Sequence, residues 1–301
     1  MASLGAAVSV LYGRTTSAEE KRQANEWLNA FATTLDAWEA SLAHIAPGFE
    51  LNVQFFAANM LLTKVKKEWR TLSEDQRRGV LAAVRGRLQA ALQEETAQAR
   101  EDARLVRERL AMALTTGAIL SGDPSFALAD AAQLLSAGNS HCDRYALLML
   151  TTAAESADGL DRAQRQGVCT TLAGAAPEVL GAMCQLVEAP SPRLREHADL
   201  VGKCVHRWNG LHPAGDGHTL VHLADFFRTY RPLADFLLAS IVAEARENTA
   251  PPGCAGGGAA EPCSDALALL IQSSHDSTAV SQQIVASLLA HEAALASGDV
   301  G

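Results

Sequence analysis

Apolar side chains recur along most of this chain at the three- and four-residue spacing of an amphipathic helix. The pattern is clearest from residue 49 to 70, where apolar positions share one face and polar positions another. Similar segments, separated by short turns, are predicted at 17–33, 35–45, 73–88, 98–120, 123–138, 140–156, 160–173, 175–188, 191–207, 217–229, 231–247, 263–274 and 276–296. Because no stretch alternates in the manner of a strand, the chain is predicted to be all-α.

Local start and stop signals support these helices. Ser17 is followed three residues later by Glu20, and Ser73 by Gln76, which is the spacing of a capping box. The Pro-Gly pair at 47–48 predicts a break before the helix at 49–70. Helix pairs recurring every 35–50 residues are typical of an α-solenoid, although periodicity alone also permits a many-helix globular domain. The segment 249–262, rich in Gly, Ala and Pro, is predicted to be a flexible loop.

Charge is distributed unevenly along the 301 residues. The net charge is −9, because residues 111–301 carry −10 and residues 1–110 carry +1. An acidic surface is a poor partner for nucleic-acid phosphates or anionic lipid and a better one for a basic protein. No run of 18 apolar residues occurs, so no membrane insertion is expected. The six widely spaced cysteines are expected to be reduced, buried thiols.

Sequence signals for catalysis are weak. His218 and His222 stand four residues apart near Asp216, but no Glu follows the first His, so a loop leading into a helix is the better interpretation than a zinc site. The basic stretch 64–109 also holds many acidic residues, which favours a mixed solvated face over a nucleic-acid site. Motifs for phosphate, dinucleotide or nucleophile-elbow chemistry are missing from the sequence. The chain is therefore expected not to be an enzyme and to use no cofactor or metal.

Several short motifs in the first eighty residues occur in a characteristic order. They are VLY at 10–12, KRQANEWLNAF at 21–31, AW at 37–38, QFFAANMLLTKVKKEW at 54–69, then Leu72 and Arg77. This order and spacing resemble the N-terminal domain of importin-beta superfamily nuclear transport receptors. The resemblance is closest to the transportin-SR branch, which imports arginine-serine-rich splicing proteins. Asn59 stands where many members have Gln, and the 251–262 insertion has no counterpart. Family members are also longer, so the chain looks like the N-terminal part of such a receptor.

The resemblance implies a fold and a function. It implies about six HEAT-like antiparallel helix pairs in a right-handed superhelix, with importin-like, Ran-binding repeats at 1–120 and further repeats at 121–301. It also implies a receptor (karyopherin) that carries protein cargo, basic or arginine-serine-rich, into the nucleus and releases it when Ran-GTP binds. Such a receptor binds phenylalanine-glycine nucleoporins and shuttles between cytoplasm and nucleus through the nuclear pore. The alternative is a helical-repeat scaffold with no Ran or transport role.

Within this resemblance, the inner helices at 18–33, 49–70 and 98–120 are the expected Ran-binding elements. Apolar positions of the motif are expected to form its structural core: Trp27, Trp38, Phe56, Leu61 and Trp69. Polar positions at other helical phases are the candidates for contact with Ran: Glu26, Asn29, Asn52, Asn59, Thr63 and Lys66.

Overall fold

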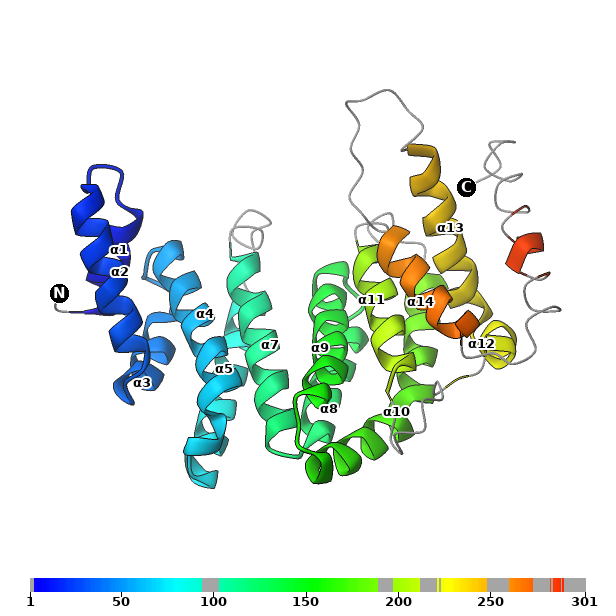
Figure 1. Ribbon diagram of the computed structural model, residues 1–301, viewed down its shortest axis with the longest axis horizontal. Coiled ribbons are helices and arrows are strands. Elements are labelled where there is room, and N and C mark those ends of the chain that lie inside the picture. Colours follow the sequence, from blue (N-terminus) through cyan, green and yellow to red (C-terminus); the bar gives the residue numbers. More distant parts are fainter. Residues whose placement is uncertain are drawn as a thin grey trace. The chain divides into compact units, whose positions relative to one another are not determined.

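The computed structural model describes residues 3–93, 103–188, 197–211, 221, 223–247, 260–272, 282, 284–287 and 289. These residues form helices and turns, with no strand among them, and the helices pack as stacked pairs (Figure 1). The predicted fold class, an all-α protein of solenoid type, is confirmed. The chain divides into two compact units, residues 1–127 (unit 1) and 128–301 (unit 2), and the division falls within helix α8 (Pro124–Ser136).

Unit 1 consists of three helix pairs within its described residues. Helix α1 (Leu4–Tyr12) packs on α2 (Ala18–Ala32), and α3 (Asp36–His44) packs on α4 (Leu51–Glu68). After a short 3-10 helix η1 (Trp69–Thr71), α5 (Glu74–Leu92) packs on α7 (Arg104–Leu120). Helix α4 also contacts α1 and α7, so it joins the pairs into one stack.

Unit 2 contains a second stack. Helix α11 (Ala198–Asn209) lies between α9 (Ser140–Asp158) and α14 (Ala260–Gln272), while α10 (Arg162–Glu188) packs on α9 and on α13 (Arg231–Glu247). The short α12 (Leu223–Thr229) packs on α13. At Gly202, a Cβ would lie 2.8 Å from the backbone nitrogen of Cys263, so the absence of a side chain permits α11 and α14 to pack backbone to backbone.

Both predicted capping boxes are present. The backbone nitrogen of Glu20 donates to Ser17 Oγ at 3.2 Å, and the backbone nitrogen of Ser17 donates to Glu20 Oε2 at 2.8 Å. In the same way, Gln76 N donates to Ser73 Oγ and Ser73 N donates to Gln76 Oε1. Each box satisfies donors that a helix leaves unpaired at its first turn, and for this reason α2 and α5 begin where the sequence predicts.

Two helices differ from the sequence-based expectation. The sequence pattern predicts no helix before residue 17, yet α1 forms and buries Leu4, Ala7 and Val8. The two helices predicted at 160–173 and 175–188 are one helix, α10, with Pro177 inside it. Proline normally ends a helix because it lacks the N–H donor. Here the buried residues keep helical spacing on both sides of the proline, so tertiary packing outweighs the lost hydrogen bond: Val168, Cys169, Leu172, Ala176, Val179, Leu180 and Met183.

Helix α10 is also long and apolar enough to cross a membrane by length and composition alone, with a mean hydropathy of 1.2 over its best window. In the folded chain, 39% of that window is buried. Core helices of soluble proteins meet the same criterion, so the absence of a membrane-spanning segment stays a prediction.

Several other predictions fall on or near residues outside the described ranges. The candidate residues Asp216, His218 and His222, most of the predicted loop at 249–262 and most of the helix predicted at 276–296 lie there. The last three residues of that loop, 260–262, form the first turn of α14. The domain boundary predicted at residue 120 coincides with the end of α7, whereas the compact units divide after residue 127.

Candidate partner-binding surface of unit 1

Four of the six candidate contact residues form one exposed row along α4. Asn52, Asn59, Thr63 and Lys66 are all exposed, and their spacings of seven, four and three residues place them on one face of the helix. We call this row the α4 stripe. Its hydrogen-bonding groups are amides, a hydroxyl and an ammonium. Thr63 Oγ1 donates to the Asn59 carbonyl at 2.9 Å, which leaves the hydroxyl oxygen to accept from a partner.

The other two candidates, Glu26 and Asn29, are exposed on α2. The Glu26 carboxylate accepts from Arg22 Nη1 at 2.6 Å, and the same guanidinium contacts Glu19 at 2.7 Å. Arg22 holds the pKa of the Glu19 carboxyl below its ordinary value, chiefly by donating a hydrogen bond to it. A partner that binds Glu26 must therefore compete with Arg22 or contact the two side chains together.

Helix α7 adds a cation beside the α4 stripe that sequence reasoning did not single out. The Arg109 guanidinium lies 6.0 Å from the ring centroid of Phe55, which is half-buried on α4. At the start of α7, Arg104 donates to Glu108 at 3.0 Å. The position of Arg109 depends on how α4 and α7 pack, so spacing within either segment gives no signal for it. A cation over an aromatic ring is a favourable pair that a partner's acidic group could also contact.

The five residues expected in the core of the motif fall into two groups. Trp38, Leu61 and Trp69 are buried, and Trp69 donates from Nε1 to Ser121 Oγ at 3.0 Å. Trp27 and Phe56 are half-buried. Trp27 stacks on Phe31 of its own helix, with ring centroids 4.9 Å apart and planes inclined by 6°.

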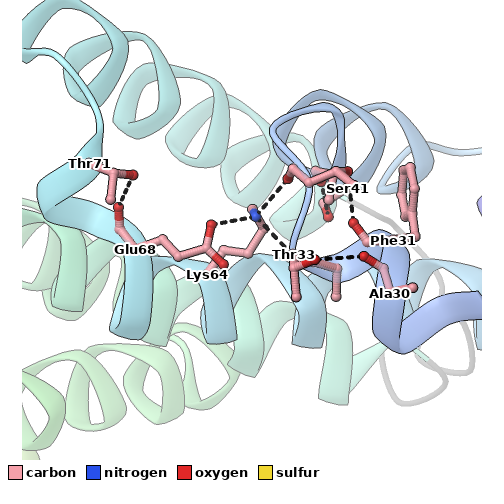
Figure 2. A network of polar contacts seen from close by, with 10 residues as sticks. Ala30, Phe31, Thr33, Ser41, Lys64, Glu68 and Thr71 are labelled. Atoms are coloured by element: carbon pink, nitrogen blue, oxygen red, sulfur yellow. Dashed lines mark hydrogen bonds and ion pairs between the residues drawn. The ribbon is translucent and has the colours of Figure 1, made fainter. Parts of the chain in front are cut away.

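A buried lysine connects α4 to the end of α2. Lys64 is 2% exposed, and its Nζ donates to the carbonyl oxygens of Ala32 and Thr34 at 2.9 Å each and to Glu68 Oε2 at 2.6 Å (Figure 2). The three N–H donors of the ammonium are thus all used. The ammonium also lies 5.3 Å from the ring centroid of Trp38.

These hydrogen bonds complete the C-terminus of α2, which has no glycine cap. The Thr33 and Thr34 hydroxyls donate to the carbonyls of Ala30 and Phe31, each at 2.8 Å, and Lys64 supplies the donor for Ala32 (Figure 2). A cation at this end also opposes the partial negative charge of the helix dipole. Lys64 therefore holds α2 against α4, the two helices that carry the six candidate residues.

The interpretation of 64–109 as a mixed solvated face is wrong for two of its basic residues. Lys64 and Arg107 are buried, at 2% and 0% exposure. The helical phase contains a signal for Lys64, because it follows Leu61 by three residues and Met60 by four, in line with the buried face of α4. Lys64 is buried because carbonyls at the end of α2 need a hydrogen-bond donor. These carbonyls belong to a segment about thirty residues earlier in the chain.

The cysteines that the structure describes lie in unit 2. Five of them are buried, namely Cys142, Cys169, Cys184, Cys204 and Cys263. Burial raises the pKa of the Cys204 thiol from 9.0 to about 12. In the described part of the chain, no group of three or more His, Cys, Asp or Glu side chains could hold a metal ion.

Comparison with known proteins identifies one domain. Residues 24–82 match the family model of the importin-beta N-terminal domain. The matched segment runs from α2 through α4 into α5 and contains all six candidate contact residues. The curated proteins include no sequence that matches this chain. The match covers this segment of unit 1 and shows that it is similar to that domain.

Proposed function

We propose that this chain is a nuclear transport receptor, or the N-terminal part of one, that binds Ran-GTP through α2, α4 and α7. The observation that carries the proposal is the coincidence of the matched domain at 24–82 with the exposed α4 stripe. The stripe presents amide, hydroxyl and ammonium groups, which suit the polar surface of a folded partner. It has no catalytic role in this proposal, and the chain acts by binding alone.

The proposal extends to cargo and to import by the transportin-SR branch. Unit 2 belongs to the acidic part of the chain, and some of its carboxylates are held in exposed ion pairs, such as Glu155 with Arg207 at 3.3 Å and Asp199 with Lys203 at 3.5 Å. Exposed pairs of this kind contribute little to stability, so a basic or arginine-serine-rich cargo can displace the resident cation at low cost. We further propose that the chain binds phenylalanine-glycine nucleoporins in the nuclear pore. This binding would permit it to shuttle between cytoplasm and nucleus.

The test is the affinity of the full chain for Ran loaded with GTP or with GDP, measured at physiological salt by titration calorimetry. We expect binding of the GTP form and at least tenfold weaker binding of the GDP form. Lys66→Glu should weaken binding of the GTP form about tenfold, because it reverses a charge within the α4 stripe. Lys203→Glu makes the same charge change in unit 2, outside the proposed surface, and should leave the affinity unchanged.

The alternative function, a helical scaffold, predicts a different result. A folded chain that binds neither nucleotide form of Ran would contradict the receptor proposal and favour the scaffold. Equal weakening by Lys66→Glu and Lys203→Glu would instead contradict the α4 stripe as the contact surface, since the effect would then follow net charge alone.

A further inference from the structure

An apolar groove of about 330 Å³ lies between α3 and α5 in unit 1. Apolar residues dominate its lining, with one carboxylate and one amide among them: Leu35, Trp38, Glu39, Leu42, Leu72, Gln76, Gly79 and Val80. This volume lies at the lower end of the range for ligand pockets, so the groove is large enough to take an apolar side chain of a partner. None of the six candidate contact residues lines it, so the groove is separate from the surface of the proposed function.

Three residues of the groove depart from the preferences that stabilise a fold. Leu35 is 73% exposed and occupies the N-cap position of α3, where it makes no side-chain cap hydrogen bond. Polar residues are strongly preferred at that position, and leucine is preferred in a core. Gly79 lies in the interior of α5, where glycine costs about 1 kcal/mol relative to alanine. A Cβ there would meet nothing within 4 Å, so no close packing requires the glycine.

The third departure is Trp38, which is buried while its Nε1 donor has no hydrogen-bond acceptor. An unpaired buried donor costs on the order of 1–3 kcal/mol. Departures from local preference that converge on one place are typical of functional sites. Here they have a shared effect, since Leu35 and Gly79 keep the groove both apolar and open.

The charges near the groove indicate the chemistry of its occupant. Glu39 lines the groove and forms no ion pair with any residue in the described part of the chain. Asp36 and Glu74 are also exposed at the first turns of the two flanking helices. Two cations of the adjoining helices are engaged elsewhere: Arg78 of α5 pairs with Asp75 at 2.5 Å, and the Lys64 ammonium, 5.3 Å from the Trp38 ring centroid, donates three hydrogen bonds.

We propose that the groove between α3 and α5 binds a protein segment in which an apolar side chain lies next to an arginine or lysine. The apolar side chain occupies the space beside Leu35, Leu42 and Gly79, and its basic neighbour pairs with the Glu39 carboxylate. This is a second binding surface of unit 1, and it does not depend on whether the chain binds Ran.

The experiment selects binders from a displayed library of random 12-residue peptides against the full chain and measures synthetic versions by fluorescence anisotropy. Gly79→Leu fills the groove, and Gly86→Leu is its matched control, because Gly86 also lies in α5 with open space around it but does not line the groove. Circular dichroism establishes that each variant is folded. Leu35→Asn is the second variant, and it should retain stability because asparagine is a favoured N-cap.

We expect the selected peptides to combine an apolar residue with an adjacent Arg or Lys. Their affinity should fall at least tenfold with Gly79→Leu or Leu35→Asn and stay unchanged with Gly86→Leu. Glu39→Gln should weaken binding three- to tenfold and reduce its dependence on salt. Three results would overturn the proposal: no selected peptide, peptides without a basic residue that are insensitive to Glu39→Gln, or equal binding to the chain and to both groove variants.

Discussion

Replacing Lys64 by methionine removes the buried ammonium and keeps an unbranched apolar side chain of similar length. The substitution deletes three hydrogen bonds, at 2.9, 2.9 and 2.6 Å, and leaves the carbonyls of Ala32 and Thr34 without this donor. Because these carbonyls belong to the end of α2 and the turn after it, we expect the loss of structure to be greatest where α2 meets α4.

The magnitude follows from the burial of the partners. Breaking a buried ion pair by removing one partner costs about 3–5 kcal/mol. Glu68 is 31% exposed, so water can solvate its carboxylate after the substitution. The cost of breaking the ion pair is therefore smaller than for a fully buried pair. Methionine also avoids the cost of burying a charge, which offsets part of the loss. We expect Lys64→Met to lower the free energy of unfolding of unit 1 by about 2–4 kcal/mol.

The assay is urea unfolding of the full chain, followed by tryptophan fluorescence, together with amide hydrogen exchange resolved by segment. Exchange should accelerate most at the C-terminal turn of α2 and in residues 33–36. Lys67→Met is the matched control, because Lys67 is the same residue type on α4 but is exposed, and it should change stability by less than about 0.5 kcal/mol. If Lys64→Met is as stable as Lys67→Met, the ammonium does not hold α2 in place and the reasoning fails.

Two further predictions concern unit 2. Gly202→Ala places a Cβ 2.8 Å from Cys263 N and forces α11 and α14 apart, so it should destabilise unit 2 by about 1–3 kcal/mol in urea unfolding despite alanine's better helix propensity. Gly174→Ala, also within a helix but in open space, should stabilise it by about 0.5–1 kcal/mol, and the opposite order would contradict the close approach. In the folded chain, burial raises the pKa of the Cys204 thiol to about 12, so the unfolded chain loses the thiol proton at a lower pH than the folded chain. The contribution of this thiol to the free energy of unfolding should therefore decline as the pH rises from about 9 toward 12. The stability difference between the native chain and Cys204→Val should therefore shift with pH in that range, and a constant difference would refute the assignment.

Helix positions and the exposed α4 stripe could be predicted from the sequence because both depend on spacing within one segment. The capping boxes at Ser17 and Ser73 bind residues three positions away, so their geometry is local. Apolar periodicity likewise places Leu61 and Trp69 on the buried side of α4 and η1 and leaves Asn59 exposed, since a helix fixes the direction of each side chain.

Sequence reasoning failed where a residue's environment is supplied by a distant segment. From the sequence, Lys64 is expected on a solvated face, as is usual for lysine. It is buried because the end of α2, about thirty residues earlier in the chain, places two carbonyl acceptors beside its ammonium. Pro177 predicts a break in the helix when the local sequence is considered alone. The helix α10 is nevertheless continuous, because its packing on α9 and α13 stabilises it. Arg109 becomes part of the candidate surface through its contact with Phe55 on α4.

The sequence by itself determined that the chain is helical and where most helices begin. It also contains the similarity of residues 24–82 to importin-beta N-terminal domains. The tertiary structure alone decided which charged side chains are buried, where α11 and α14 touch through backbone, and that α3 and α5 leave an apolar groove between them. The physical reason is that backbone hydrogen bonding in helices is local, whereas burial and charge pairing depend on which helices become neighbours.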